Sequence, residues 1–417
     1  MKICLITAFY SPYEPGGAPI AVRILAEALK KQGHDVFIIT TGPYEGLKSL
    51  KPRIRYEKGI KVYYFYPLQP NIPVYTKKYS GFSLIFTFLL NFWNPHTYFV
   101  IRNILKKENP SIIDVKEVHN FLSNSVYSVI KTLNIPYIYT IYTNLLLFPV
   151  DNLPLLDKLA GIKYPLLGYN YNVYKVISKI YQKINKIIID SPEHVLFDSN
   201  SVKNLFNNHN FFKDSEKIVF PIIFKTNKHK LKNLSKNTKT IDILYRGTIR
   251  HKGGQTLIQA FKQIPNKNLR LHIFGGGRDE KFFKELAEGD ERINFYGWIS
   301  NDERDRLYQF ADLTVMPSIY FETFGMVIVE SFMAGVPVIG SNVGAIPELI
   351  KEGYNGWLFE SGNVEQLKER LEYAIKNKDK LKKMRKNCIK TAEKYSVENN
   401  IHRLEEIYRE MLKRYSK

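Results

Sequence analysis

The sequence predicts an α/β fold made of two domains, each with a parallel sheet. In the first half, apolar runs of strand length alternate with patterns of helical spacing, as such sheets require. In the second half, the buried-strand pattern Leu313–Met316 precedes a helical pattern that begins at Gly325. A polar, lysine-rich stretch separates the halves. We therefore expect a first domain over 1–222, a linker over 223–240 and a second domain over 241–395.

Individual elements of the first domain follow from the same patterns. We expect a helix over Ala18–Lys31, ended by Gly33 as a C-cap, with His34 in a structural role. Strands are expected near residues 2–9, 35–40, 60–66, 111–115, 136–141 and 194–199.

Composition limits the compartment. The chain has 417 residues, 44% of them hydrophobic, which is enough for two cores. Its two cysteines suggest neither a disulfide framework nor a metal cluster, so a reducing compartment is expected, with Cys4 as a small core residue. The N-terminal residues 1–9 have the pattern of a first strand and not of a signal peptide, so we expect a cytoplasmic protein.

Charge and one apolar segment raise the question of a membrane partner. Residues 82–93 are strongly apolar and flanked by basic residues, but fall short of the ~20 residues that span a bilayer. This segment is either an interfacial membrane segment or acceptor-groove wall, or an internal helix. The formal net charge of +21 fits anionic lipid headgroups on the inner face of the membrane, or a solvated lysine-rich surface. Nucleic acid is not expected as a partner, because the lysines are scattered and no recognition motif accompanies them.

The segment 318–330 combines two glutamates with a helix start. Glu322 follows a strand at its carboxyl end, where open α/β sheets bind ligands, and Glu330 lies about two turns into the next helix. The helix start presents unpaired backbone N–H groups suited to a phosphate, those of Gly325, Met326 and Val327. One carboxylate can meet sugar hydroxyls while the other accepts from a ribose diol. Alone, each glutamate could be an ordinary helix-end or surface charge, but the apolar neighbours of Glu330 disfavour that for the pair.

Six ordered motifs carry a family resemblance. They are Lys252-Gly253, Phe274-Gly275-Gly276-Gly277, Pro317-Ser318, Glu322-Thr323-Phe324-Gly325, Glu330 and Gly344-Ala345-Ile346-Pro347-Glu348. With them, the run from Leu244 to about Ala374 resembles the nucleotide-binding half of a retaining GT-B glycosyltransferase of family four, the "glycosyl transferases group 1" type. Gly16-Gly17, the following helix and Gly33-His34 extend the likeness to the first domain. The resemblance implies two Rossmann-like domains facing each other across a cleft, with the last helix, 396–417, crossing back onto the first domain.

The resemblance also implies a site for a nucleoside diphosphate sugar. Lys252 would contact the diphosphate, with Arg246 or Arg250 as a second cation. The candidate catalytic residues are His119, Glu322 and Lys252. The residues expected to bind the nucleotide sugar are Gly16, Gly17, Arg246, Gly247, Arg250, Lys252, Gly275, Gly276, Ile299, Phe324, Gly325, Met326, Val327 and Glu330.

His119 lies just past the strand expected at 111–115, and a histidine at this position of the family faces the donor sugar. A structural role is the alternative for a lone histidine. In retaining enzymes of this kind the departing diphosphate assists the incoming hydroxyl on the same face, so the protein mainly positions groups. No metal and no cofactor are expected, because the sequence has no Asp-x-Asp, no His-x-x-x-His and no cysteine cluster.

Two departures from the family pattern stand out. The family's Gly-Arg-Leu and longer turn are replaced by Gly247-Thr248-Ile249-Arg250-His251-Lys252, where Arg250 could substitute for the missing arginine. Tyr142-Thr143 stands where relatives often carry His-Asp or Arg-Asp, which bears on acceptor handling.

Together these features predict a metal-independent, retaining glycosyltransferase in polysaccharide or glycolipid biosynthesis. Its partners would be a nucleotide diphosphate-sugar donor and a glycan or lipid-linked acceptor. A sugar-nucleotide epimerase of the same architecture and a non-catalytic nucleotide-sugar-binding protein remain as alternatives. A dinucleotide oxidoreductase is disfavoured, because Gly275-Gly276-Gly277 follows a later strand and not the first.

Overall fold

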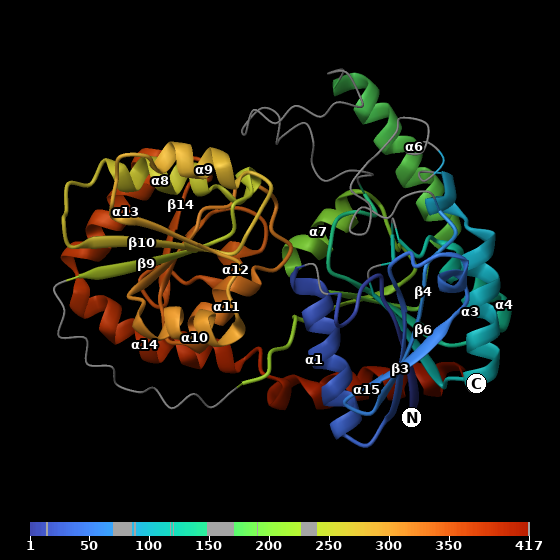
Figure 1. Cartoon of the computed structure of the whole chain (residues 1–417). Helices are drawn as coiled ribbons and strands as arrows, with labels where there is room; N and C mark the ends of the chain where they lie inside the picture. Colours follow the sequence, from blue (N-terminus) through green and yellow to red (C-terminus); the bar gives the residue numbers. More distant parts are fainter. Residues whose placement is uncertain are drawn as a thin grey trace. The chain divides into compact units, whose positions relative to one another are not determined.

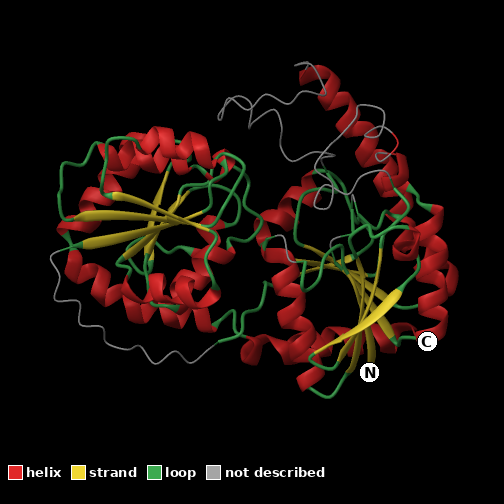
Figure 2. Ribbon diagram, in the orientation of Figure 1, coloured by secondary structure: helices red, strands yellow, loops and turns green. Residues whose placement is uncertain are grey.

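The computed structural model forms two compact α/β units (Figures 1 and 2). The first contains the described part of residues 1–225 and the segment from Val397 onward, and the second is Thr226–Ser396. The described residues are 1–13, 16–69, 86, 89–116, 118–119, 121–147, 171–189 (side chains from Ser178), 191–226 and 240–415.

The first unit has an eight-stranded sheet of order β3-β4-β2-β1-β5-β6-β7-β8. All neighbours are parallel except β3 and β4. Each strand predicted from the sequence is confirmed, whereas β3 and β8 were not predicted because these edge strands are largely polar and lack an apolar run. The strands are β1 Lys2–Ile6, β2 Asp35–Thr41, β3 Arg53–Glu57, β4 Ile60–Phe65, β5 Ile112–Val115, β6 Tyr137–Ile141, β7 His194–Phe197 and β8 Glu216–Val219.

The helices of this unit begin and end at recognisable caps. Helix α1 starts at Gly17 after Gly16, whose φ of 97° suits glycine, and Gly33 adopts φ 83° just past its end. The Asn94 side chain caps α3 by accepting from Thr97 N, with Pro95 at the first helical position. The helices are α1 Gly17–Lys31, η1 Leu47–Leu50, α3 Pro95–Glu108, α4 Ser125–Leu133, α6 Tyr171–Ile189, α7 Asn200–Asn208 and α15 Val397–Tyr415.

The second unit has a six-stranded, fully parallel sheet of order β11-β10-β9-β12-β13-β14. Numbered within the unit this order is 3-2-1-4-5-6, that of a Rossmann fold. The strands are β9 Ile241–Arg246, β10 Leu269–Phe274, β11 Ile293–Gly297, β12 Leu313–Met316, β13 Val338–Ser341 and β14 Gly356–Phe359. The helices are η2 Arg250–Lys252, α8 Gly254–Lys262, α9 Glu280–Ala287, α10 Asn301–Phe310, α11 Met326–Met333, α12 Ile346–Leu349, α13 Val364–Lys376 and α14 Lys378–Glu393.

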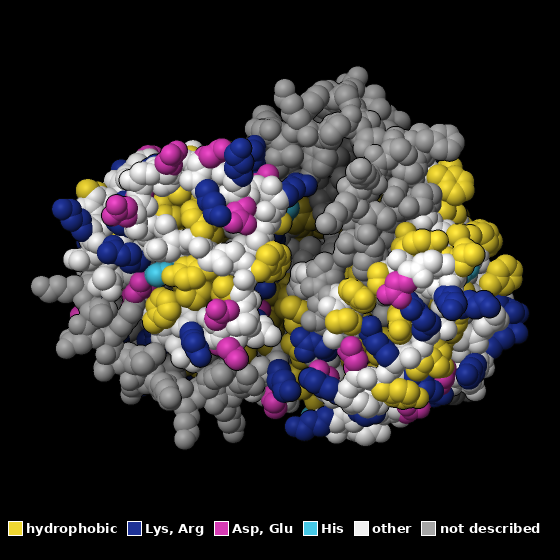
Figure 3. All heavy atoms as spheres, viewed as in Figure 1, with side chains coloured by type: hydrophobic (Ala, Val, Ile, Leu, Met, Phe, Trp, Pro, Cys, Tyr) yellow, Lys and Arg dark blue, Asp and Glu magenta, His cyan; other side chains and the backbone are white. Residues whose placement is uncertain are grey.

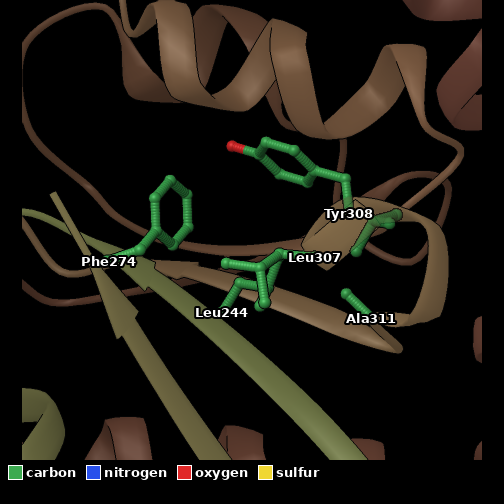
Figure 4. Close-up of a cluster of buried hydrophobic side chains, with 6 residues drawn as sticks. Leu244, Phe274, Leu307, Tyr308 and Ala311 are labelled. Carbon is green, nitrogen blue, oxygen red and sulfur yellow. The ribbon is translucent and has the colours of Figure 1, made fainter. Parts of the chain in front are cut away.

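Strand order places the ligand-binding edge of the second unit between β9 and β12. The order reverses there, and in open α/β sheets ligands bind outside the carboxyl ends of the strands at such a switch point. Below it, α10 packs on β9 and β10 through a buried cluster that includes Leu244, Phe274 and Leu307 (Figure 4). The helix predicted from Gly325 is confirmed as α11, with Gly325 at its N-cap.

In the described part of the chain, no helix is long and apolar enough to cross a membrane. Half of the apolar segment 82–93, residues 82–85, 87 and 88, lies outside the described residues. Of its described members, Phe86, Leu89 and Trp93 expose about half of their surface (51%, 58% and 48%), so these side chains are not internal.

The last helix, α15, is attached to the first unit by a buried polar network. The Tyr408 hydroxyl donates to Asp114 Oδ2 over 2.6 Å, and the same carboxylate accepts from Lys116 Nζ (2.6 Å) and Thr140 Oγ1 (2.8 Å). Near the middle of α15, His34 Nε2 lies 2.7 Å from Glu405 Oε1. Burying a carboxylate without hydrogen-bond partners costs free energy. The hydrogen bond to Asp114 therefore favours the position of α15 in which Tyr408 reaches it.

Tyr408→Phe should therefore destabilise the first unit by about 1–3 kcal/mol, because Asp114 loses a buried hydrogen bond while the ring still fits. Urea unfolding followed by circular dichroism measures the change. Tyr415→Phe, at a tyrosine 40% exposed on the same helix, serves as the control. Equal stability of the Tyr408→Phe and Tyr415→Phe variants would contradict the anchoring role.

Candidate active site

Two ion pairs meet at the edge between β9 and β12. In the first, Lys252 Nζ lies 2.6 Å from Glu322 Oε1, which also accepts from Ser318 Oγ over 2.7 Å. The Lys252 side chain is 34% exposed and that of Glu322 only 9%. The pair thus joins a fixed, enclosed carboxylate to a cation that reaches solvent.

Backbone crowding holds these loops together. Gly253 has φ 76°, and a Cβ there would lie 1.7 Å from the Pro317 carbonyl oxygen. A Cβ on Gly344 would lie 2.2 Å from the Glu322 carbonyl oxygen, which accepts from Ala345 N over 2.8 Å. Both glycines are required by close backbone approach, and their contacts fix the position of Glu322.

The groups around the Lys252–Glu322 pair determine the charge of Glu322 and of the adjacent His251. Burial raises the pKa of Glu322, but the Lys252 ammonium and the hydrogen bonds from Lys252 and Ser318 outweigh it, so that the pKa lies below its usual value. Burial and the adjacent Lys252 lower the pKa of His251 to about 4. At neutral pH the site therefore holds a carboxylate, an ammonium and a neutral imidazole.

The second ion pair joins β9 to α11. Arg246 Nη1, at the end of β9, lies 2.7 Å from Glu330 Oε2. Their side chains are 31% and 16% exposed. The pair links residues that are far apart in the sequence. Its glutamate lies on α11, the helix whose first turn presents the Met326 and Val327 amides.

Arg250 takes a different direction from Arg246. Its guanidinium stacks over the Phe282 ring at 4.0 Å, with Nε 3.6 Å from Asp279 Oδ1. Its backbone N–H donates to the same carboxylate over 2.9 Å. Of the two arginines that the sequence left open, the structure brings Arg246 to Glu330 and holds Arg250 against α9.

Phe324 and Ile299, two residues predicted to bind the nucleotide sugar, pack their side chains against the protein. Phe324 is 3% exposed and packs edge-on against Tyr395, 5.6 Å between ring centroids. Ile299 packs against the buried cluster of Figure 4. The Phe324 side chain therefore faces the interior, whereas that of Ile299 is only partly buried.

The glycine turns after β9 and β10 lie side by side, and an unpredicted tryptophan adjoins them. Gly247 and Gly275 adopt φ values of 102° and 81°. A Cβ on Gly276 would lie 2.2 Å from Trp298 Nε1. Trp298 is 83% exposed, so it contributes little to the core. In the sequence, the large aromatic residue directly after Gly297 was the signal that could have predicted Trp298 beside these turns.

Predicted site residues of the first unit lie at the carboxyl edge of its own sheet. Gly16 and Gly17 begin α1 after β1, and His119 follows β5, the neighbour of β1. His119 is buried: Nδ1 lies 2.8 Å from Asn124 Oδ1 and Nε2 lies 2.6 Å from Tyr139 Oη. Both ring nitrogens are therefore engaged by protein groups, and a catalytic part for His119 stays a prediction.

Tyr142, which stands where relatives often carry His or Arg, is also buried, and Lys116 Nζ lies 5.6 Å from its ring centroid.

No group of three or more His, Cys, Asp or Glu that could hold a metal occurs among the described residues. Cys4 and Cys388 are both buried and free.

Two family models match the chain almost end to end. "Glycosyltransferase Family 4" matches residues 15–221 and "Glycosyl transferases group 1" matches residues 226–395. The chain belongs to glycosyltransferase family 4 and has the GT-B fold. The family model boundary at 221–226 falls close to the division between the two compact units of this glycosyltransferase.

Known proteins similar to this glycosyltransferase cover nearly its whole length. The alpha-monoglucosyldiacylglycerol synthase of Acholeplasma laidlawii is 24% identical, over 100% of this chain and 99% of its own. Sucrose-phosphate synthase from Thermosynechococcus elongatus has a TM-score of 0.73 at 18% identity, covering 98% of each chain. Anabaena HepE, solved with UDP-glucose, has a TM-score of 0.66 at 16% identity, covering 98% and 99%. The two solved structures show the shared fold.

His119 makes the stability of this glycosyltransferase depend on pH. Burial lowers its pKa to about 4, below the usual 6.5 of an unfolded chain, so the unfolded state binds more protons between these values. The stabilisation is complete above about pH 6.5 and is lost as the pH falls toward 4. It amounts to at most about 3 kcal/mol.

Replacing His119 with Gln should make the melting temperature less dependent on pH in that window. The measurement is differential scanning calorimetry from neutral to mildly acidic pH, with His402→Gln, at an exposed imidazole, as the control. An unchanged pH dependence in His119→Gln would contradict the buried neutral imidazole.

Proposed function

We propose that this glycosyltransferase moves a sugar, with retention, from a nucleoside diphosphate sugar to a glycan or lipid-linked acceptor in polysaccharide or glycolipid biosynthesis. The observation that carries the proposal is the pair of ion pairs Lys252–Glu322 and Arg246–Glu330 at the carboxyl edge between β9 and β12. Such an edge is where open α/β sheets bind nucleotides.

Diphosphate binding falls to cations that can reach solvent. Lys252 and Arg246 are each about one-third exposed, so their charged ends can turn toward a phosphate without unfolding their loops. The first-turn amides of α11 add N–H donors and the positive end of the helix dipole. These groups neutralise the departing diphosphate, so we propose that transfer needs no divalent metal.

The two glutamates bind hydroxyl groups at different ends of the donor. Both hydrogen bonds to Glu322 go to Oε1, and within the described residues Oε2 has no partner, so Oε2 can accept from the sugar. Glu330 likewise uses Oε2 for Arg246, and no described residue bonds its Oε1, which can accept from the ribose diol. Because Glu322 is fixed by Ser318 and ionised, it orients the sugar without rearranging.

In the transfer itself, the bond from the anomeric carbon to the diphosphate oxygen breaks, and the acceptor oxygen bonds to the same carbon on the same face. The acceptor proton passes to the departing diphosphate, so no protein base is needed. Lys252 and Arg246 stabilise the negative charge that develops on the leaving group.

Relatives guide the choice of substrates for testing. The structure of HepE with UDP-glucose makes UDP-sugars the first donors to test. The name of the Acholeplasma enzyme makes diacylglycerol-linked acceptors the first lipids to test. A product that contains both sugar and acceptor supports transfer. Interconversion of the donor without acceptor would favour the epimerase, and binding without turnover the non-catalytic protein.

Substitutions of Lys252 and of Glu322 should have different effects on nucleoside diphosphate binding and on turnover. Lys252→Ala should weaken the free nucleoside diphosphate by about 1.5–3 kcal/mol and also lower turnover, because a charge-assisted bond to phosphate is lost. Glu322→Gln should leave that affinity nearly unchanged and reduce turnover about 10- to 100-fold, because its bond to the sugar acts mainly near the transition state.

Calorimetric titration and a product assay measure these effects, with Lys281→Ala, at a 91% exposed lysine, as the matched control. If Glu322→Gln loses the nucleoside diphosphate as severely as Lys252→Ala, the sugar-side role of Glu322 is wrong.

Activity should persist in excess EDTA, because Lys252, Arg246 and helix amides neutralise the phosphates. The assay compares initial rates with EDTA alone and with added magnesium or manganese. Complete loss in EDTA that either metal restores would show that the protein cations are insufficient.

A further inference from the structure

The Tyr308 hydroxyl on α10 is buried without a hydrogen-bond partner. Tyr308 is 3% exposed, and no group of the described residues bonds to its Oη. Leaving a buried hydroxyl unpaired costs free energy, so such a group needs an explanation. Exposed charges are a less specific signal, because basic and acidic side chains are intermixed over the visible surface of the second unit (Figure 3).

Sheet geometry brings this hydroxyl to the Arg246–Glu330 ion pair. The Tyr308 ring packs in the buried cluster with Leu244 of β9 and Phe274 of β10, 6.0 Å from the Phe274 ring centroid (Figure 4). Arg246 follows Leu244 by two positions and is paired with Phe274 in the sheet register. Because side chains alternate between the faces of a strand, Arg246 leaves the sheet on the face that α10 covers. Tyr308 therefore lies next to Arg246 and, through it, to Glu330.

The charge of Glu330 acts on two side chains of α10. Burial raises the pKa of Tyr308, and the Glu330 carboxylate raises it further, whereas Arg246 lowers it. Burial lowers the pKa of Arg304, but the carboxylates of Glu330 and Asp305 outweigh it, so that the pKa lies above its usual value. Arg304 and Tyr308 are four residues apart and share one face of α10. This face is therefore close to Glu330, although neither side chain bonds to it in the free protein.

Nucleotide binding changes what Glu330 needs. If Arg246 turns toward the diphosphate, Glu330 loses the one described side chain that donates to it. The Glu330 side chain is only 16% exposed, so a carboxylate left there without a donor would be costly. Freed from Arg246, it can turn toward α10, where the Tyr308 hydroxyl offers a donor that nothing else in the described structure uses.

We propose that Tyr308 is a positioning residue whose hydroxyl donates to Glu330 in the nucleotide-bound protein. One carboxylate oxygen then accepts from Tyr308 while the other accepts from the ribose diol. The unpaired hydroxyl of the free protein gains its partner only on binding, so this hydrogen bond contributes to nucleotide affinity and not to the stability of the empty fold. The inference rests on the ribose-binding role of Glu330 proposed above and adds the group that holds this glutamate from α10.

The test is calorimetric titration of Tyr308→Phe with UDP, or with ADP or GDP if either binds the wild-type protein more tightly. The affinity should fall about tenfold, because a hydrogen bond to a charged group is lost. In urea unfolding without nucleotide, the same variant should be as stable as the wild-type protein or more stable, because phenylalanine removes an unpaired buried hydroxyl. In a Glu330→Ala background, Tyr308→Phe should have no further effect on affinity.

Tyr296→Phe is the matched control, because the Tyr296 hydroxyl already lies 2.8 Å from His272 Nδ1 in the free protein. It should lower stability and leave nucleotide affinity unchanged, the reverse of Tyr308→Phe. The positioning role is wrong if Tyr308→Phe binds the nucleotide as tightly as the wild-type protein, or if its effect persists in the Glu330→Ala background. If Glu330→Ala itself leaves the affinity unchanged, or if none of the three nucleotides binds, the donor site proposed above is wrong and the role of Tyr308 is overturned with it.

Discussion

A buried carboxylate that must stay charged organises the second unit. Glu322 is 7% exposed, and an ion at such a depth is stable only with a close countercharge and fixed hydrogen bonds. Lys252 and Ser318 supply them, but they come from loops after different strands. Those loops meet because β9 and β12 are neighbours at the point where strand order reverses, so the electrostatics of the site depends on sheet topology.

The first unit also contains a buried carboxylate that is held by hydrogen bonds from distant segments, at a position for which no chemistry is proposed. Asp114, fully buried at β5, receives bonds from Lys116, Thr140 and Tyr408. Tyr408 belongs to the last helix of the chain, so a carboxylate near the middle of one sheet determines where the C-terminus packs. In both units, a single buried acid couples segments that are distant in sequence.

Sequence patterns could predict the central strands and the helix at Gly325, because local periodicity defines them, but not the direct ion pair of Lys252 with Glu322, since each residue was assigned to the ligand separately. They could not predict β3 and β8, whose edge positions leave them polar. The Arg246–Glu330 pair was also missed, since each residue was assigned to the ligand separately. The inward turn of Phe324, the enclosure of His119 and the exposure of Trp298 depend on tertiary packing, which no local pattern encodes.

The glycines that crowd the edge between β9 and β12 have a consequence for how this enzyme can diversify. Gly253 and Gly344 each face a backbone oxygen at a distance that excludes any side chain, so these walls of the site cannot be remodelled by substitution. Trp298, on the neighbouring loop, is 83% exposed and supports almost nothing in the core. Evolutionary or engineered change at this edge should therefore accumulate after β11, while the walls formed by the two glycines remain constant.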